Sequence, residues 1–200
     1  MRVRLPRALL TLAAAAASAT TFPTTAAAWN LLKNPDFIGG TAGWTLSASN
    51  IGTAGNESFF GSPINGSLRL QSSNFNDGAH AEQCVDVSKW LVVDFTLRKL
   101  YDGESGTGTH AFKVETYDAA ACSGNKLGTI AMPESGASVD GNPAGLWVEV
   151  SVAGSPLPSG ALSAKVALDT SAGTAGSSYY IIDDVRLVPT DAILLDDFDD

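Results

Sequence analysis

LVVDFTLR, residues 91–98, is the clearest of several segments in which apolar and polar side chains alternate. The apolar residues at positions 91, 93, 95 and 97 share one face of an extended chain, and Asp94, Thr96 and Arg98 share the other. The same period of two recurs in 67–71, 111–118, 162–169 and 181–187. No segment longer than ten residues has a convincing helical period, so the pattern predicts half-buried β-strands.

Weaker strand signals occur elsewhere along the chain, in segments 29–32, 44–49, 80–87, 127–132 and 147–152. Turn-forming clusters such as Asn65-Gly66 separate the segments. About nine strands with one apolar and one polar face each predict two antiparallel sheets packed face to face. A jelly roll suits this number. The expected fold class is therefore all-β, a two-sheet antiparallel β-sandwich over residues 29–189.

The first 28 residues have the composition of an export signal. Arginines at positions 2, 4 and 7 precede an apolar run, 9–17, that is too short to cross a bilayer as a helix. Ala26-Ala27-Ala28 predicts cleavage before Trp29, with a cut near Ala19 as the second choice and an uncleaved anchor as the alternative. We expect a protein secreted into the periplasm or the extracellular space.

The charge of the chain limits its partners. Cleavage after residue 28 removes three arginines and no acids, which leaves 9 basic and 21 acidic residues and changes the net charge from −9 to −12. Such an acidic surface repels phosphate backbones, so nucleic-acid binding is not expected. No other stretch is apolar enough to span a membrane.

The two cysteines, Cys84 and Cys122, predict one disulfide, because an even number of cysteines in an exported protein favours pairing. Free thiols or intermolecular bonds are the alternatives. Residues 190–200 form an acidic C-terminal tail that also contains isoleucine, leucine and phenylalanine. We expect this tail to dock in part and fray in part; a sorting signal or a calcium-binding patch is the alternative.

Common catalytic motifs are absent: the chain has no Gly-x-Ser-x-Gly, His-Glu-x-x-His or glycine-rich phosphate loop. The polar strand faces instead carry side chains that suit a sugar, which requires an aromatic ring and polar groups. These candidate ligand-binding residues are Asp94, Arg98, Lys113, Glu115, Tyr117 and Lys165. If their strands share a sheet, they form one polar surface. The alternatives are a solvated sheet with ion pairs such as Arg98–Glu115, and a loop site around Phe59, Phe60 and Phe75.

Several short motifs occur in an order that resembles a known family. They are Asn34-Pro35-Asp36-Phe37, Gly43-Trp44, Gln83–Val87, Tyr117-Asp118 with Cys122-Ser123-Gly124, Trp147–Val150 and Tyr180–Leu187. This order resembles the carbohydrate-binding modules with a galactose-binding-like jelly roll that are attached to bacterial xylanases and cellulases. The resemblance covers about residues 30–188. It implies a non-catalytic protein that binds a polysaccharide or another glycan.

The resemblance also implies a structural calcium ion between the first and last strands, at Asp36 and Asp183. Asp183 shares a face with Ile181, Val185 and Leu187, so its carboxylate is expected to point inward, where it must be paired or bound. Ile38 stands where the family motif usually has Glu. An Asp183 bonded to backbone amides is the alternative.

The leading hypothesis is thus a secreted, non-catalytic β-sandwich that binds a glycan. A protein of the extracellular space or cell surface that uses the same fold for structural or adhesive protein contacts is the second hypothesis. A hydrolase is the third, because acid pairs arise by chance among 21 acids.

Overall fold

The computed structural model describes residues 29–48, 53–57, 66–72, 78–101, 109–133, 147–171 and 178–190. The predicted export signal, the tail beyond Thr190, and Phe59, Phe60 and Phe75 lie outside these residues. The described parts contain ten strands and a short 3-10 helix, η1 (Ala120–Cys122). Because η1 has three residues, no helix in these ranges could cross a membrane.

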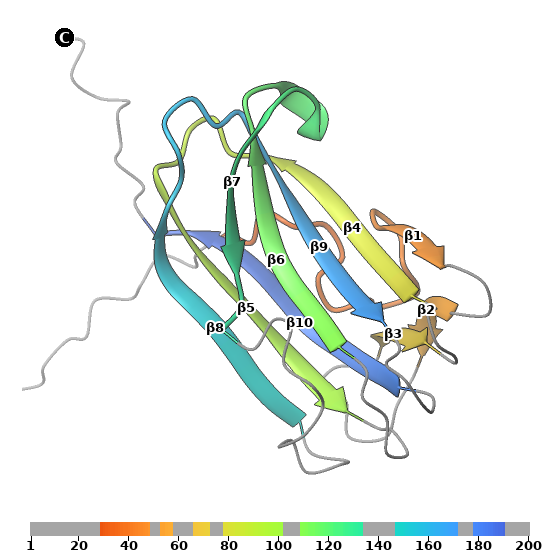
Figure 1. Cartoon of the computed structure of the whole chain (residues 1–200). Helices are drawn as coiled ribbons and strands as arrows, with labels where there is room; N and C mark the ends of the chain where they lie inside the picture. Colours follow the sequence, from red (N-terminus) through yellow and green to blue (C-terminus); the bar gives the residue numbers. More distant parts are fainter. Residues whose placement is uncertain are drawn as a thin grey trace, which may run out of the picture.

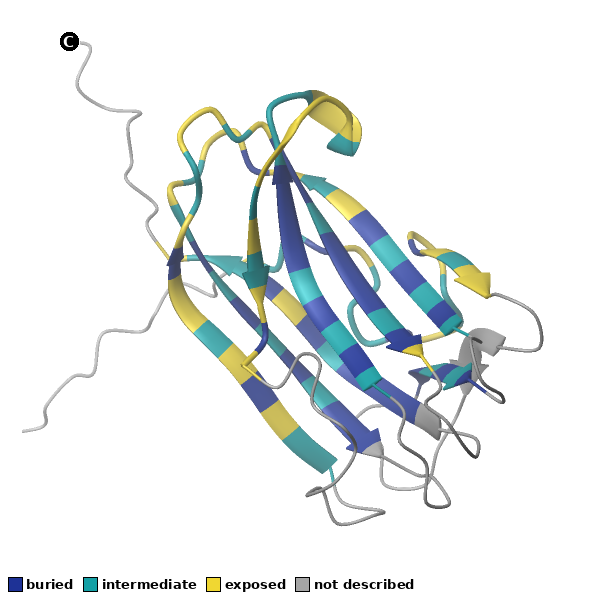
Figure 2. Cartoon of the chain, in the orientation of Figure 1, coloured by how far each residue is buried: buried dark blue, intermediate teal, exposed yellow. Residues whose placement is uncertain are grey.

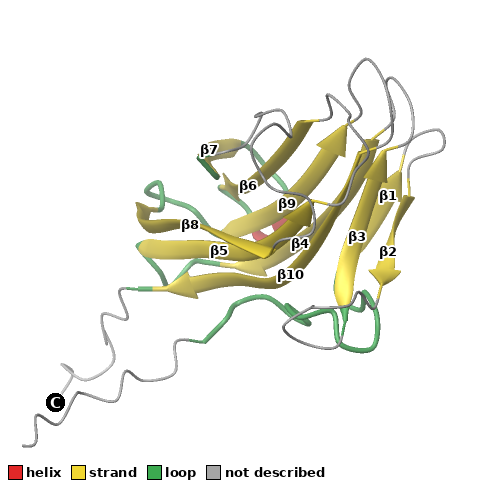
Figure 3. Cartoon of the chain, turned by 90° about the horizontal axis from the view of Figure 1, so that it is seen from below, coloured by secondary structure: helices red, strands yellow, loops and turns green. Residues whose placement is uncertain are grey.

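The strands form two five-stranded sheets, and the predicted β-sandwich is confirmed (Figures 1 and 3). Sheet A has the order β1 (Thr45–Ala48), β4 (Gly78–Asp86), β9 (Ser163–Ser171), β6 (Thr109–Tyr117) and β7 (Lys126–Ala131). Sheet B has the order β2 (Thr53–Glu57), β3 (Ser67–Ser72), β10 (Ser178–Pro189), β5 (Val92–Tyr101) and β8 (Trp147–Pro156). Neighbouring strands are antiparallel. β2 was not predicted from the sequence, and the strand expected at 29–32 does not form.

The core lies between the two sheets and follows the predicted alternation. Along β4, β6 and β9, buried and partly exposed residues alternate (Figure 2). Phe112 and Val114 of β6 and Phe95 and Leu97 of β5 are wholly buried. The polar side chains of these strands therefore lie on the outer surfaces of the sheets. A ligand could bind to them there.

The Asn34–Phe37 motif is a turn that closes one side of the sandwich. Asn34 and Phe37 adopt left-handed φ angles of 47° and 50°, and the Asn34 side chain donates to the Gly40 carbonyl at 2.8 Å. The turn buries the Phe37 ring completely, 5.3 Å from the ring of Trp44. Burial of such a ring contributes about 2–3 kcal/mol. The motif therefore anchors the N-terminal segment, which also bonds β10 through Val185 N–H and the Pro35 carbonyl, 3.1 Å apart.

A β-bulge in β10 corrects one expectation. The register with β5 shifts between Asp183 and Arg186, and Asp184 has a left-handed φ of 50°. Tyr180 and Ile182 join the core before the bulge, and Val185 and Leu187 join it after the bulge. The prediction that Asp183 shares the face of Val185 and Leu187 is wrong, because the extra residue changes the phase of the alternation. Asp183 is nevertheless fully buried.

The predicted disulfide between Cys84 and Cys122 is present, with Cα atoms 5.9 Å apart. It joins β4 to η1, across the end of β9. Ser163 at the start of β9 strengthens this connection, because its hydroxyl accepts from Cys122 N–H at 2.9 Å and donates to the Ala119 carbonyl at 2.6 Å. The loop that follows Tyr117 is thereby fixed to sheet A. Such a bond fits an oxidising compartment.

Candidate functional site

The outer surface of sheet A collects charged side chains from four strands. Strand register aligns Ser47, His80 and Asp169 in one row, Glu82 and Lys113 in the next, then Lys165 with Glu115, and finally Tyr117 with Lys126. We call this surface the charged face. Its members are His80, Glu82, Lys113, Glu115, Tyr117, Lys126, Lys165 and Asp169. The members on β4, β6 and β9 alternate with core residues, which fixes the direction in which they point. Lys126 begins β7 and reaches the same surface through its contact with Glu115.

Glu115 is the centre of the charged face. Its carboxylate lies 3.4 Å from the Nζ atoms of Lys126 and Lys165 and 3.5 Å from that of Lys113. The Tyr117 hydroxyl donates to it at 2.9 Å. Burial acts to raise its pKa, but the hydrogen bond from Tyr117 and the charges of Lys113 and Lys165 outweigh burial and lower the pKa to about 2. Glu115 is therefore ionised at neutral pH.

Lys165 connects the two halves of the charged face. Its ammonium group lies 3.3 Å from Glu82 as well as 3.4 Å from Glu115, and 5.7 Å from the centroid of the Tyr117 ring. Partial burial acts to lower the pKa of Lys165, but Tyr117 and Glu82 raise it above its ordinary value. Lys165 is therefore charged at neutral pH and lies beside the ring of Tyr117. Among the described strands of sheet A, Tyr117 is the only tyrosine, phenylalanine or tryptophan on the charged face.

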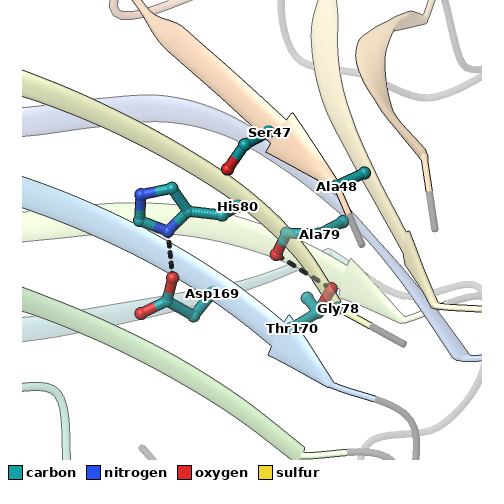
Figure 4. Close-up of a pocket in the computed structure, with 7 residues that line it drawn as sticks. All are labelled: Ser47, Ala48, Gly78, Ala79, His80, Asp169 and Thr170. Atoms are coloured by element: carbon teal, nitrogen blue, oxygen red, sulfur yellow. Dashed lines mark hydrogen bonds and ion pairs between the residues drawn. The ribbon is translucent and has the colours of Figure 1, made fainter. Parts of the chain in front are cut away.

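His80 occupies the other end of the charged face, between two carboxylates. Its Nδ1 contacts Asp169, and its Nε2 lies 3.0 Å from Glu82. An open pocket of about 300 Å³ adjoins it, lined by Ser47, Ala48, Gly78, Ala79, His80, Asp169 and Thr170. In Figure 4 the imidazole and the Asp169 carboxylate lie side by side, from β4 and β9. Lys113 contacts the second Asp169 oxygen at 3.4 Å, which joins this end to Glu115.

The loop after Tyr117 borders the charged face at its other end. Asp118 accepts hydrogen bonds from the backbone and the side chain of Asn125, at 2.7 Å and 2.9 Å. The disulfide holds η1 against β4 on the same side. A pocket of about 350 Å³ lies there, lined by Cys84, Val85, Asp86, Ser88, Ala120, Ala121, Leu162 and Ser163. Tyr117 thus sits beside a fixed loop, which pre-organises its ring.

The structure brings together four of the six residues predicted to bind a ligand: Lys113, Glu115, Tyr117 and Lys165. Arg98 and Asp94 do not join them, because β5 belongs to sheet B. Arg98 lies 3.6 Å from Glu149 and 3.7 Å from Asp184, so the Arg98–Glu115 ion pair that was named under the alternative of a solvated sheet does not form. Asp94 accepts from the Gly154 N–H at 2.6 Å and thus holds β8 beside the irregular part of β5.

Sequence reasoning missed four members of the charged face: His80, Glu82, Lys126 and Asp169. Three of them could have been predicted from the alternation of their strands. Asp169 lies on the same predicted strand face as Lys165, and His80 lies on the same predicted face as Glu82. Nothing in the sequence indicated that β4 and β9 are neighbours, 89 residues apart at His80 and Asp169. Lys126 begins a strand whose predicted start was Leu127.

Asp36 and Asp183, where the resemblance implies calcium, lie near the β10 bulge. The Asp183 carboxylate accepts from Asp184 N–H at 2.7 Å. Burial, followed by repulsion from the nearby Asp184 carboxylate, raises the pKa of Asp36. Among the described residues, no three His, Cys, Asp or Glu side chains gather into a metal-binding group. A calcium ion here would therefore depend on main-chain carbonyl oxygens for most of its six to eight ligands.

Comparison with known proteins identifies the fold. No family model and no curated protein sequence matches this chain. The structure is similar to TmCBM61, solved in complex with β-1,4-galactotriose, with a TM-score of 0.53 and 19% identity over 80% of this chain and 99% of that one. It is also similar to the C-terminal family 22 carbohydrate-binding module of Clostridium thermocellum Xyn10B, with a TM-score of 0.54 and 16% identity over 78% and 90% of the two chains.

A third similar structure is the enzymatically active domain of tailspike protein 4 from bacteriophage CBA120, with a TM-score of 0.60 and 17% identity over 80% of this chain. The match spans 21% of that tailspike chain, so most of the tailspike has no counterpart here. Identities this low establish the fold alone. The chain therefore has the β-sandwich fold of carbohydrate-binding modules, as the order of its motifs predicted.

Proposed function

We propose that this protein binds a carbohydrate through the charged face and is secreted after removal of residues 1–28. The observation that carries the proposal is the position of Tyr117. Its half-buried ring lies in a surface of hydrogen-bonding groups from β4, β6, β7 and β9, beside a loop fixed by the Cys84–Cys122 disulfide. Sugars are bound by such a combination of an aromatic face and oriented polar groups. The similarity in fold to TmCBM61, which was solved with β-1,4-galactotriose, supports a sugar as the class of ligand.

We propose binding without catalysis. Glycoside hydrolysis requires a carboxylic acid that is still protonated near neutral pH. On the charged face the opposite holds, since the pKa values of Glu82, Glu115 and Asp169 all lie below their ordinary values despite partial burial. His80 and a lysine stabilise the carboxylates of Glu82 and Asp169, and the Tyr117 hydroxyl with Lys113 and Lys165 stabilises that of Glu115. None of these three acids is suited to donate a proton to a leaving group.

A titration with face-specific variants tests the proposal. Polysaccharides that retard the protein in affinity gels would be titrated calorimetrically against the wild type, Tyr117→Ala, Tyr117→Phe and Arg98→Ala. We expect Tyr117→Ala to weaken binding about tenfold or more, because a stacked ring is lost. Tyr117→Phe keeps the ring and should lose less. Arg98→Ala, on sheet B, should bind like the wild type. Equal losses in Tyr117→Ala and Arg98→Ala, or no retardation by any polysaccharide, would refute the proposal.

We also propose a structural calcium ion near Asp36 and Asp183. The carboxylate of Asp183 is fully buried. Burial and the nearby Asp184 disfavour the ionised form of Asp36. A cation beside these two groups would stabilise both carboxylates. The ion would stabilise the link between the N-terminal turn and β10. It has no part in the proposed sugar site, since β10 belongs to sheet B.

A further inference from the structure

The basic residues are distributed unevenly in this acidic protein. The chain carries a net charge of −9 and has six lysines. Three of the six, Lys113, Lys126 and Lys165, converge on the single carboxylate of Glu115, at 3.4–3.5 Å. Over the whole charged face, these three lysines and His80, which faces a carboxylate at each ring nitrogen, meet three carboxylates, Glu82, Glu115 and Asp169. This leaves one positive charge in excess when His80 is protonated.

The other two acids of the charged face, Glu82 and Asp169, each have two cationic partners. Lys165 also contacts Glu82, and Lys113 also contacts Asp169, but these two acids are shared with His80 between them. Lys126 has Glu115 as its ion-pair partner, and its side chain is 52% exposed. Lys126 is therefore the cation of the charged face that is best placed to contact an anionic ligand, because the one further carboxylate of the adjoining loop, Asp118, is already bonded to Asn125.

We infer that the glycan bound by the charged face is acidic and carries carboxylates, as a polyuronate does. This inference rests on the proposed function and specifies the ligand class. A sugar carboxylate on the solvent side of Lys126 gains a charge-assisted hydrogen bond, while its ring remains within reach of Tyr117. A neutral sugar would leave the exposed lysine in water and gain nothing from it.

The charge of the remaining surface selects among anions. A nucleic acid or an anionic membrane presents dense phosphates over a wide area, and the acidic remainder of the protein would repel it. A polyuronate has one carboxylate per sugar, attached to an uncharged pyranose ring. That chemistry matches a small cationic patch with one aromatic residue at its edge.

Two forms of one polysaccharide, with its carboxylates free or converted into uncharged methyl esters, test the inference. The probes are polygalacturonate and fully methyl-esterified polygalacturonate, in affinity gels at 50 and 500 mM NaCl, with neutral galactan as a third gel. We expect retardation by polygalacturonate at 50 mM NaCl, weaker retardation at 500 mM because salt screens exposed charges, and little retardation by the ester. Lys126→Ala should reduce the affinity for polygalacturonate roughly threefold to tenfold.

Lys89→Ala is the matched control, because Lys89 is an exposed lysine in the turn between β4 and β5 and is not a member of the charged face. It should bind like the wild type. Equal losses in both lysine variants would overturn the inference, since attraction would then be unspecific. Retardation by the ester or by galactan, with none by polygalacturonate, would overturn the acidic class but leave sugar binding intact. No retardation in any gel, including the wider polysaccharide series, would overturn both.

Discussion

His80 is engaged at both ring nitrogens, by Asp169 at Nδ1 and by Glu82 at Nε2. An imidazole that faces an acceptor on each side is protonated, because both nitrogens must donate. The hydrogen bond to Asp169, opposed by partial burial and helped by Glu82, raises the pKa of His80 above 6.5. The His80 cation therefore belongs to the ion-pair network, together with Lys113, which contacts Asp169, and Lys165, which contacts Glu82.

The raised pKa of His80 makes stability depend on pH. The folded protein binds this proton more tightly than the unfolded chain, so the stabilisation is complete below pH 6.5 and is lost as the pH rises through the folded pKa. We expect His80→Gln to reduce the free energy of unfolding at pH 6 by about 0.5–1 kcal/mol, since the contacts are partly exposed. The difference should shrink at pH 9. Urea denaturation at both pH values measures it, and an unchanged difference would contradict the role given to His80.

At the scale of single elements, the faces of strands were predictable and their neighbours were not. A period of two correctly placed Phe112 and Val114 in the core and Lys113 and Glu115 outside, because alternation is a local property of an extended chain. Which sheet a strand joins depends on pairing between distant segments. Hence Arg98 and Glu115, both correctly placed on polar faces, lie on opposite sheets.

Two local features, the strand β2 and the bulge in β10, could not be predicted from the alternation of apolar and polar residues. β2, with the sequence TAGNE, has no apolar alternation, and its pairing with β3 defines it as a strand. The bulge in β10 inserts one residue at Asp184 and changes the face of every residue before it relative to those after it. Asp183 therefore does not share the face of Val185 and Leu187, although it is fully buried.

The β10 bulge is also where calcium would act. If an ion bound by Asp36 and Asp183 joins the N-terminal turn to β10, a chelator should lower the melting temperature. A site that is saturated about 100-fold above its dissociation constant contributes about 2.7 kcal/mol, which corresponds to roughly 5–10 °C for a domain of this size. Asp183→Asn should abolish this response to chelator. An identical melting temperature with and without chelator, in protein that analysis shows to be metal-free, would exclude the calcium site.

At the scale of the whole molecule, the sandwich separates two polar surfaces. Sheet A carries the charged face, with Tyr117 and half of the lysines of the chain. Sheet B carries Arg98, Glu149, Asp184 and Arg186, whose ion pairs link β5 to its neighbours β8 and β10. Under the proposed function, ligand binding takes place on sheet A, while the ion pairs on the outer surface of sheet B hold its strands together.

The most direct test of this assignment is the position of a bound glycan, measured by amide chemical-shift changes during a titration with an oligosaccharide of a polysaccharide that retards the protein. We predict that the largest changes fall on β4, β6, β7 and β9, centred on Glu115, Tyr117 and Lys126, while the amides of β5 and β8 change little. Changes centred on Arg98 and Glu149 of sheet B, with a silent charged face, would contradict the assignment.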